Sequence, residues 1–168
     1  DALNDIRNLE TAIKAAKKEN GHAQVAISYT LGEVFTHEYY MNYAKQNREC
    51  RCRFYLYQGY GGSFRLPYEA ETLVKDLKSA VKIPIQLHTH YTSGLASMCI
   101  LKAVEAGVDG VDTAMSPLAL GTSHAPTESI VATFKGTEYD TGLDLVKLNV
   151  IRDYFMKLRK KYIDNRSA

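Results

Sequence analysis

The sequence predicts an α/β fold in which parallel strands are covered by outer helices. Short apolar segments, such as 23–29 and 108–113, alternate along the chain with longer segments whose apolar residues recur at helical spacing. Gly21 and Gly107 close two of the helical patterns, as glycines at helix C-termini do. Because a helix-length segment separates successive strands, we expect the strands to pair in parallel with the helices packed outside the sheet.

The individual elements follow from these patterns in chain order. Ile6, Leu9 and Ile13 share one face of the first helical segment, and Pro67 suits the first turn of a later helix. The expected elements are a helix at 5–20, a strand at 23–29, helices at 37–46 and from 67 onward, a strand that ends in His88 and His90, a helix at 95–106, a strand at 108–113, a helix after 127 and a last helix at 143–162.

Composition excludes several classes of protein. The 168 residues are 45% hydrophobic and 24% charged, which suits one domain with one core. No apolar run reaches the roughly 18 residues of a membrane span, and no leader pattern opens the chain, so we expect a cytoplasmic protein without a membrane span. The odd count of cysteines, Cys50, Cys52 and Cys99, argues against a disulfide framework. A net charge of +2 does not by itself imply nucleic acid as a partner.

Two alternating histidines end the strand that runs through Ile85 and Leu87. Residues i and i+2 of a strand point to the same side, so His88 and His90 are expected to present two imidazoles to one point. Two neutral imidazoles begin a site for Zn²⁺, Mn²⁺ or Co²⁺, which needs at least one further protein ligand. Histidines that make ordinary hydrogen bonds at the mouth of a loop would show the same spacing.

Thr92 and Ser93 follow the histidines and precede a predicted helix. They place two hydroxyl groups beside the unpaired backbone N–H groups of a helix start, where anions and oxyanions are favoured. Ordinary N-capping of the helix is the alternative interpretation of both residues.

Several motifs in one order resemble the carboxyltransferase domain of biotin-dependent enzymes. The specific motifs are PIQLHTH at 84–90 followed by TSGLAS at 92–97, and GTEYDTGLDL at 136–145. DALNDIRN at 1–8, AISYT at 26–30, EAGVDGVDTA at 105–114 and GTS at 121–123 occur in the same order. The resemblance is to the α subunit of oxaloacetate decarboxylase and to the carboxyltransferase part of pyruvate carboxylase.

The resemblance implies a function and a set of roles. It implies movement of CO₂ between carboxybiotin and pyruvate or oxaloacetate, with His88 and His90 as metal ligands and Thr92 as the catalytic proton shuttle. Asp112, at the next strand end, and Ser93 are supporting candidates. The biotin would come from a separate carrier domain or subunit, within a decarboxylase or carboxylase complex that is cytoplasmic or peripheral to a membrane.

The resemblance also implies that the chain is a fragment. It assigns 1–168 to the C-terminal part of a carboxyltransferase barrel of the HMG-CoA lyase-like type, that is, the second half of a (β/α)8 TIM barrel, ending in a helix that leads out of the barrel. The absent first half would supply an aspartate ligand and an arginine that binds the keto acid. Another metal-dependent lyase or condensing barrel with a His-x-His strand end is the alternative enzyme.

One segment, Asn47–Arg65, departs from the family pattern. Its arginines, tyrosines and glycines also suit a nucleic-acid-binding module, or less well a phosphate-binding loop. A one-base shift of a permitted back-translation instead yields IENAGADSICIKDM, the family's sequence at this point. We therefore expect a frameshift that removes a carbamylated lysine ligand, whose place falls at Gln58 and Gly59. With that ligand and the first-half residues missing, we expect the chain as written to lack carboxyltransferase activity.

Two further departures lie close to the histidines. Tyr91 stands where relatives commonly have alanine or aspartate, and His124 stands where a glutamine would follow GTS. We expect either residue to crowd or retune the pocket.

Overall fold

The computed structural model describes residues 4–30, 32–47, 53–58 and 67–162. Within them, four strands form one parallel sheet in the order β1-β2-β3-β4. The strands are β1 (Gln24–Tyr29), β2 (Arg53–Gln58), β3 (Ile85–His88) and β4 (Gly110–Val111). The sheet order equals the chain order, as expected when each strand is followed by a helix that returns to the next strand.

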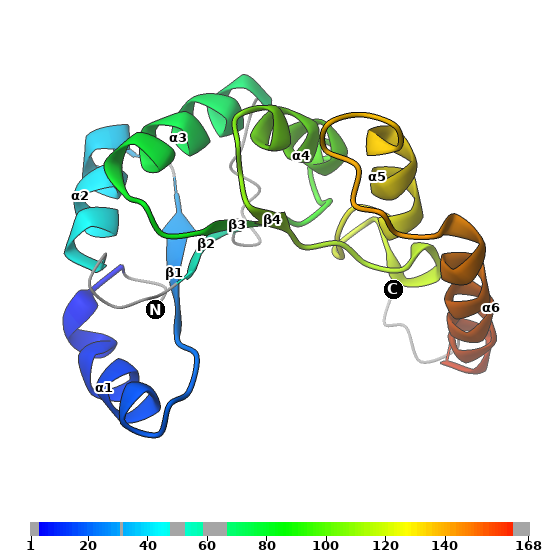
Figure 1. Ribbon diagram of the computed structural model, residues 1–168, viewed down its shortest axis with the longest axis horizontal. Coiled ribbons are helices and arrows are strands. Elements are labelled where there is room, and N and C mark those ends of the chain that lie inside the picture. The colour runs from blue at the N-terminus through cyan, green and yellow to red at the C-terminus, as the bar shows by residue number, and fades with distance from the viewer. Residues whose placement is uncertain (1–3, 31, 48–52, 59–66, 163–168) are drawn as a thin grey trace.

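The helices lie in an arc on one side of the sheet (Figure 1). In chain order they are η1 (Ile6–Asn8), α1 (Glu10–Lys18), α2 (His37–Asn47), α3 (Pro67–Ala80), α4 (Ala96–Glu105), η3 (Ser116–Leu118), α5 (Thr127–Phe134) and α6 (Leu145–Tyr162). Helices α2 to α5 follow the outer, convex side, whereas the strands line the inner side. The predicted α/β fold with parallel strands and outer helices is confirmed, and it forms an open part of a β/α barrel.

Alternate residues of the strands face the helices. Val25 and Ile27 of β1 are buried on this side, and so are Ile85 and Leu87 of β3. They pack in one core with apolar residues of the covering helices, including Tyr40, Leu73, Leu77, Ile100 and Ala103. The opposite face of β3 carries Gln86 and His88, so the polar side chains of this strand lie on the inner side of the arc.

Two predicted elements are wrong in their bounds. The helix expected at 5–20 divides into η1 and α1 at Leu9. The residue in the left-handed conformation after α1 is Asn20 (φ 57°), whereas the sequence pattern had placed Gly21 there. Gly21 N–H donates to the Ala16 carbonyl over 2.7 Å. A Cβ on Gly21 would lie 2.9 Å from that carbonyl oxygen, so this position needs glycine for the close backbone approach.

The strand expected at 108–113 is reduced to Gly110–Val111, which among the described strands pairs with β3 only. The segment that departs from the family pattern contributes an inner strand, because β2 pairs in parallel with both β1 and β3. Residues 48–52 and 59–66, which hold Cys50, Cys52 and the glycines of the suggested nucleotide or RNA-binding loop, lie outside the described residues. In the part of the chain that is described, no helix has the length and apolar character needed to cross a membrane.

The core between α3 and the sheet predicts the cost of a cavity. Leu73 of α3 is completely buried, so Leu73→Ala should lower the free energy of unfolding by about 2–5 kcal/mol. Urea unfolding followed by circular dichroism measures the loss. Leu143→Ala is the matched control, because Leu143 is 47% exposed and should change stability by less than about 1 kcal/mol. Equal losses in the two variants would contradict the packing described here.

Candidate metal centre

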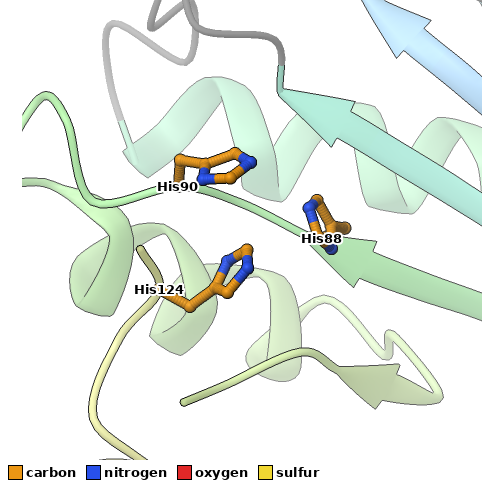
Figure 2. Close-up of side chains that lie close together, drawn as sticks. All are labelled: His88, His90 and His124. Atoms are coloured by element: carbon orange, nitrogen blue, oxygen red, sulfur yellow. The ribbon is translucent and has the colours of Figure 1, made fainter. Parts of the chain in front are cut away.

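His88 and His90 lie at the C-terminal end of β3 and turn their rings to the same side. Both are half-buried and alternate with the buried Leu87 and Thr89, as the two-residue period of an extended chain requires. The ring centroids are 5.2 Å apart with the planes nearly perpendicular. Figure 2 shows the two rings beside each other just beyond the strand arrow.

A third imidazole, that of His124, completes the cluster (Figure 2). Its ring centroid lies 4.5 Å from that of His88 and 4.6 Å from that of His90. One nitrogen from each of the three rings lies within 4.8 Å of the other two. The chain thus gathers three half-buried imidazoles from two segments more than 30 residues apart.

Main-chain hydrogen bonds hold the loop of His124 against the strand end. Tyr91 N–H donates to the Ser123 carbonyl over 2.7 Å, and Ser123 N–H donates to the Leu120 carbonyl over 2.9 Å. Leu120 (φ 68°) and Gly121 (φ 58°) both adopt the left-handed conformation that reverses the chain here. The loop therefore has a defined path that brings His124 over His88 and His90.

The Nδ1 atom of each imidazole is held by an oxygen acceptor. His88 Nδ1 lies 2.7 Å from Asp112 Oδ2, His90 Nδ1 lies 2.7 Å from the Thr122 carbonyl, and His124 Nδ1 lies 2.9 Å from the Thr89 carbonyl. A carbonyl oxygen accepts only, so Nδ1 of His90 and His124 carries the proton and Nε2 carries the lone pair. This is the tautomer that binds a metal through Nε2.

Asp112 orients the His88 ring from the neighbouring strand. Leu87 is paired with Val111, which places Asp112 beside His88, and the other carboxylate oxygen of Asp112 accepts a hydrogen bond from the Gln86 amide. Burial is the largest effect on His88 and lowers its pKa below the ordinary value. The bond to Asp112 acts in the opposite direction, and the nearby His124 and His90 lower the pKa further. The neutral, metal-binding form of His88 is favoured at pH 7.

The donor set fits a borderline divalent cation. Imidazole nitrogens suit Zn²⁺ and Co²⁺, and an orienting carboxylate or carbonyl behind each ring is the usual support of such a site. His88 and His90, expected from the sequence, do come together, and Asp112 lies directly behind one of them. The role of each as a ligand or an orienting group remains a prediction.

Thr92 and Ser93 lie in the turn between His90 and α4. Both are exposed, and Gly94 N–H donates to the Tyr91 carbonyl over 2.8 Å to close the turn. Ser93 Oγ accepts from Leu95 N–H over 3.3 Å, which is a local turn contact. Leu95 is the N-cap residue of α4, so neither Thr92 nor Ser93 caps this helix and the capping alternative is wrong. Tyr91 packs against the core, and its hydroxyl accepts a hydrogen bond from Ser97 of α4 over 3.4 Å.

Sequence reasoning did not include His124 among the candidate ligands. The sequence showed only that a histidine, His124, replaces the glutamine expected after GTS. It did not indicate that His124 would lie beside His88 and His90. The contact arises because Ala114 and Pro126 pair in a parallel bridge and the loop between them folds back over the strand end. Such a contact depends on tertiary structure.

The fold and the cluster together define part of a β/α barrel that carries three clustered histidines at and beyond the carboxyl end of β3. Residues 4–154 match the HMGL-like family model, and the chain belongs to that family. A pyruvate carboxylase subunit of Methanocaldococcus jannaschii is 55% identical over 96% of the chain and 28% of its own length. The 2-oxoglutarate carboxylase large subunit of Hydrogenobacter thermophilus is 42% identical over 96% of the chain and 25% of its own length.

A solved relative has the same fold. The carboxyl transferase domain of Rhizobium etli pyruvate carboxylase, crystallised with pyruvate and biocytin, superposes with a TM-score of 0.90 at 34% identity, over 96% of this chain and 28% of that one. The chain therefore spans less than a third of each of these three proteins.

The support of His88 by Asp112 leads to a prediction about cation affinity. Asp112→Asn removes the negative charge behind the ring, so the dissociation constant for Zn²⁺ should rise about 10- to 100-fold. Isothermal titration calorimetry of the purified chain measures it. Asp153→Asn is the control, because Asp153 is an exposed residue of α6 that pairs with Arg152. An unchanged constant in the Asp112 variant would show that the carboxylate does not support a metal ligand.

Proposed function

We propose that this chain is part of a biotin-dependent carboxyltransferase that moves CO₂ between carboxybiotin and pyruvate or oxaloacetate. The observation that carries the proposal is the pair of imidazoles from His88 and His90 at the carboxyl end of a barrel strand, backed by Asp112. Active sites of β/α barrels lie at this end of the strands. The names of the relatives, which are carboxylases of 2-oxo acids, support the same class of substrate.

The reaction exchanges a carboxyl group for a proton. The N–C bond of carboxybiotin breaks, and the methyl carbon of pyruvate, having lost a proton, forms a C–C bond to the released CO₂. The proton passes to the biotin nitrogen, and we assign its transfer to the hydroxyl of Thr92, which is exposed beyond His90. A divalent cation, when bound by His88 and His90, supplies Lewis-acid stabilisation of the enolate charge.

The remaining parts of the enzyme would come from outside this chain. We propose that residues 1–168 form the C-terminal part of the barrel and that α6 leads out of it. An aspartate, an arginine, the biotin carrier domain and other subunits of a carboxylase or decarboxylase complex would complete the assembly. A cytoplasmic location, or a peripheral place in a membrane decarboxylase complex, remains a prediction.

The loss of a lysine ligand is the second part of the proposal. In the shifted reading frame the lysine falls at Gln58 and Gly59, and Gln58 ends β2 directly beside the histidine strand, since Tyr57 is paired with His88. This position therefore lies at the end of the strand adjacent to that of the histidines. The printed sequence has no group there that can carry a carbamate, so we propose that the chain as written lacks carboxyltransferase activity.

The two alternatives are less well supported. A nucleic-acid-binding module would need its arginines and tyrosines on an accessible loop, whereas Arg53–Gln58 forms an inner strand of the sheet. A metal-dependent lyase or condensing barrel would use the same histidines, and the carboxylase relatives favour the transfer of CO₂ instead.

The proton-shuttle assignment predicts a selective loss of turnover. In the longer protein with the shifted frame restored, Thr92→Ala should lower kcat for biocytin-dependent decarboxylation of oxaloacetate by about 10²- to 10⁴-fold, because the proton has no carrier. Thr92→Ser should retain most of the activity. Thr72→Ala, on the exposed side of α3, is the control. Full activity of Thr92→Ala would exclude the assigned role.

The reading frame itself can be examined directly. Resequencing the DNA that encodes residues 45–69 should reveal compensating insertions and deletions around the segment. When the shifted frame is restored in the longer protein, oxaloacetate decarboxylation should appear, whereas the printed frame should give none. A confirmed printed frame with strong turnover would overturn the assignment of a lysine ligand to this position.

A further inference from the structure

We propose that His124 is the third protein ligand of a three-histidine site that binds Zn²⁺ or Co²⁺ together with His88 and His90. The inference deepens the proposed function, because it rests on the metal site assigned there to the two strand histidines. It adds a ligand from a different segment of the chain and specifies the class of cation.

The distances between the three imidazoles support His124 as a ligand. Two imidazoles do not hold Zn²⁺ alone, since such sites use at least three protein ligands. His124 supplies the next imidazole, with one ring nitrogen of each of the three residues within 4.8 Å of the other two. Ligand atoms about 2.0–2.1 Å from a tetrahedral ion lie roughly 3.4 Å apart, so the rings need to approach by only about 1–1.5 Å. Small side-chain rotations achieve this.

The hydrogen bond that anchors the His124 ring also supports its role as a ligand. Its Nδ1–H donates to the Thr89 carbonyl, and Thr89 lies between the other two histidines. The Thr122 carbonyl, two residues before His124, accepts from His90 Nδ1. The loop after β3 therefore anchors the ring of His124, and the loop that holds His124 anchors the ring of His90. With Nδ1 anchored, the lone pair is on Nε2, which is the arrangement found behind metal-binding histidines.

The three donor atoms of the cluster indicate which class of cation it would bind. Three neutral imidazoles favour Zn²⁺ and Co²⁺ over Mg²⁺ and Ca²⁺, which prefer oxygen ligands. Three protein ligands around a tetrahedral ion leave one position for water or substrate, as in catalytic sites. His124 thus supplies a third ligand in a chain that has no lysine at Gln58 and Gly59.

A structural role of His124 predicts a different result and can be separated from a ligand role. If the residue only fixes its loop, the bond from Nδ1 to the Thr89 carbonyl is what matters. An asparagine side chain can keep a donor near the Nδ1 position, but it has nothing at the position of Nε2. His124→Asn therefore preserves the loop contact and removes the proposed ligand.

The test is the affinity of the purified 168-residue chain for ZnCl₂ and CoCl₂, measured by titration calorimetry and by the visible absorption of bound Co²⁺. His88→Asn and His124→Asn should each weaken binding about 100-fold or more, since the loss of an outer-shell partner already costs about 10- to 100-fold. MgCl₂ should show no comparable binding. His22→Asn is the matched control, because His22 is exposed and outside the cluster. Far-UV circular dichroism compares the folding of each variant with the unmodified chain.

The outcomes separate this inference from the proposed function. If His88→Asn weakens binding and His124→Asn does not, the ligand role of His124 is wrong, while the ligand role of His88 in the proposed function stands. If the unmodified chain binds neither cation, both the inference and the metal site are overturned. A second measurement needs no variant: Zn²⁺ should shift the nuclear magnetic resonance signals of the His124 ring, and unmoved signals on a zinc-loaded chain would refute the inference.

Discussion

The pairing of β3 with β4 is the constraint on which the candidate site depends. Asp109 fixes it from both sides, because its carboxylate accepts from Ile85 N–H over 2.7 Å and its own N–H donates to the Ile85 carbonyl over 2.9 Å. In this register Asp112 N–H donates to the Leu87 carbonyl, which brings the Asp112 carboxylate beside His88. A shift of one residue would move Asp112 away from His88 and the strand side chains to the opposite face.

The second constraint is the exchange of hydrogen bonds between the two loops beyond this strand end. His90 Nδ1 and Tyr91 N–H, in the loop after β3, donate to carbonyl groups of the loop from 115 to 126. In return, His124 Nδ1 of that second loop donates to a carbonyl group of the first. The backbone carbonyl groups of these loop segments are not paired in a β-sheet ladder, so histidine side chains serve as their hydrogen-bond donors in place of backbone N–H groups. The same contacts that order the loops also orient two of the imidazoles, which links the stability of the loops to the geometry of the site.

Among the described strands the sheet is open at both edges, and this agrees with a chain that covers less than a third of its relatives. Several large apolar residues of α6 remain exposed, among them Val146 at 73%, Val150 at 70% and Tyr154 at 60%. Exposed apolar stripes of this kind are typical of surfaces that another part of a protein covers. The site is likewise only one side of a barrel mouth, because the strands described here line a concave arc (Figure 1).

The sequence by itself determined the alternation of strands and helices and the common side of His88 and His90, because both follow from local periodicity. It did not predict the split of the first helix at Leu9 or the shortness of β4. The split depends on local capping, and β4 has one partner strand among the residues that the structure describes. The sequence placed Asp112 at the next strand end as a supporting candidate, and tertiary structure decided that its carboxylate lies behind His88 and that His124 joins the cluster. Those contacts join residues 24 to 36 positions apart through strand register and loop packing, which no local pattern encodes.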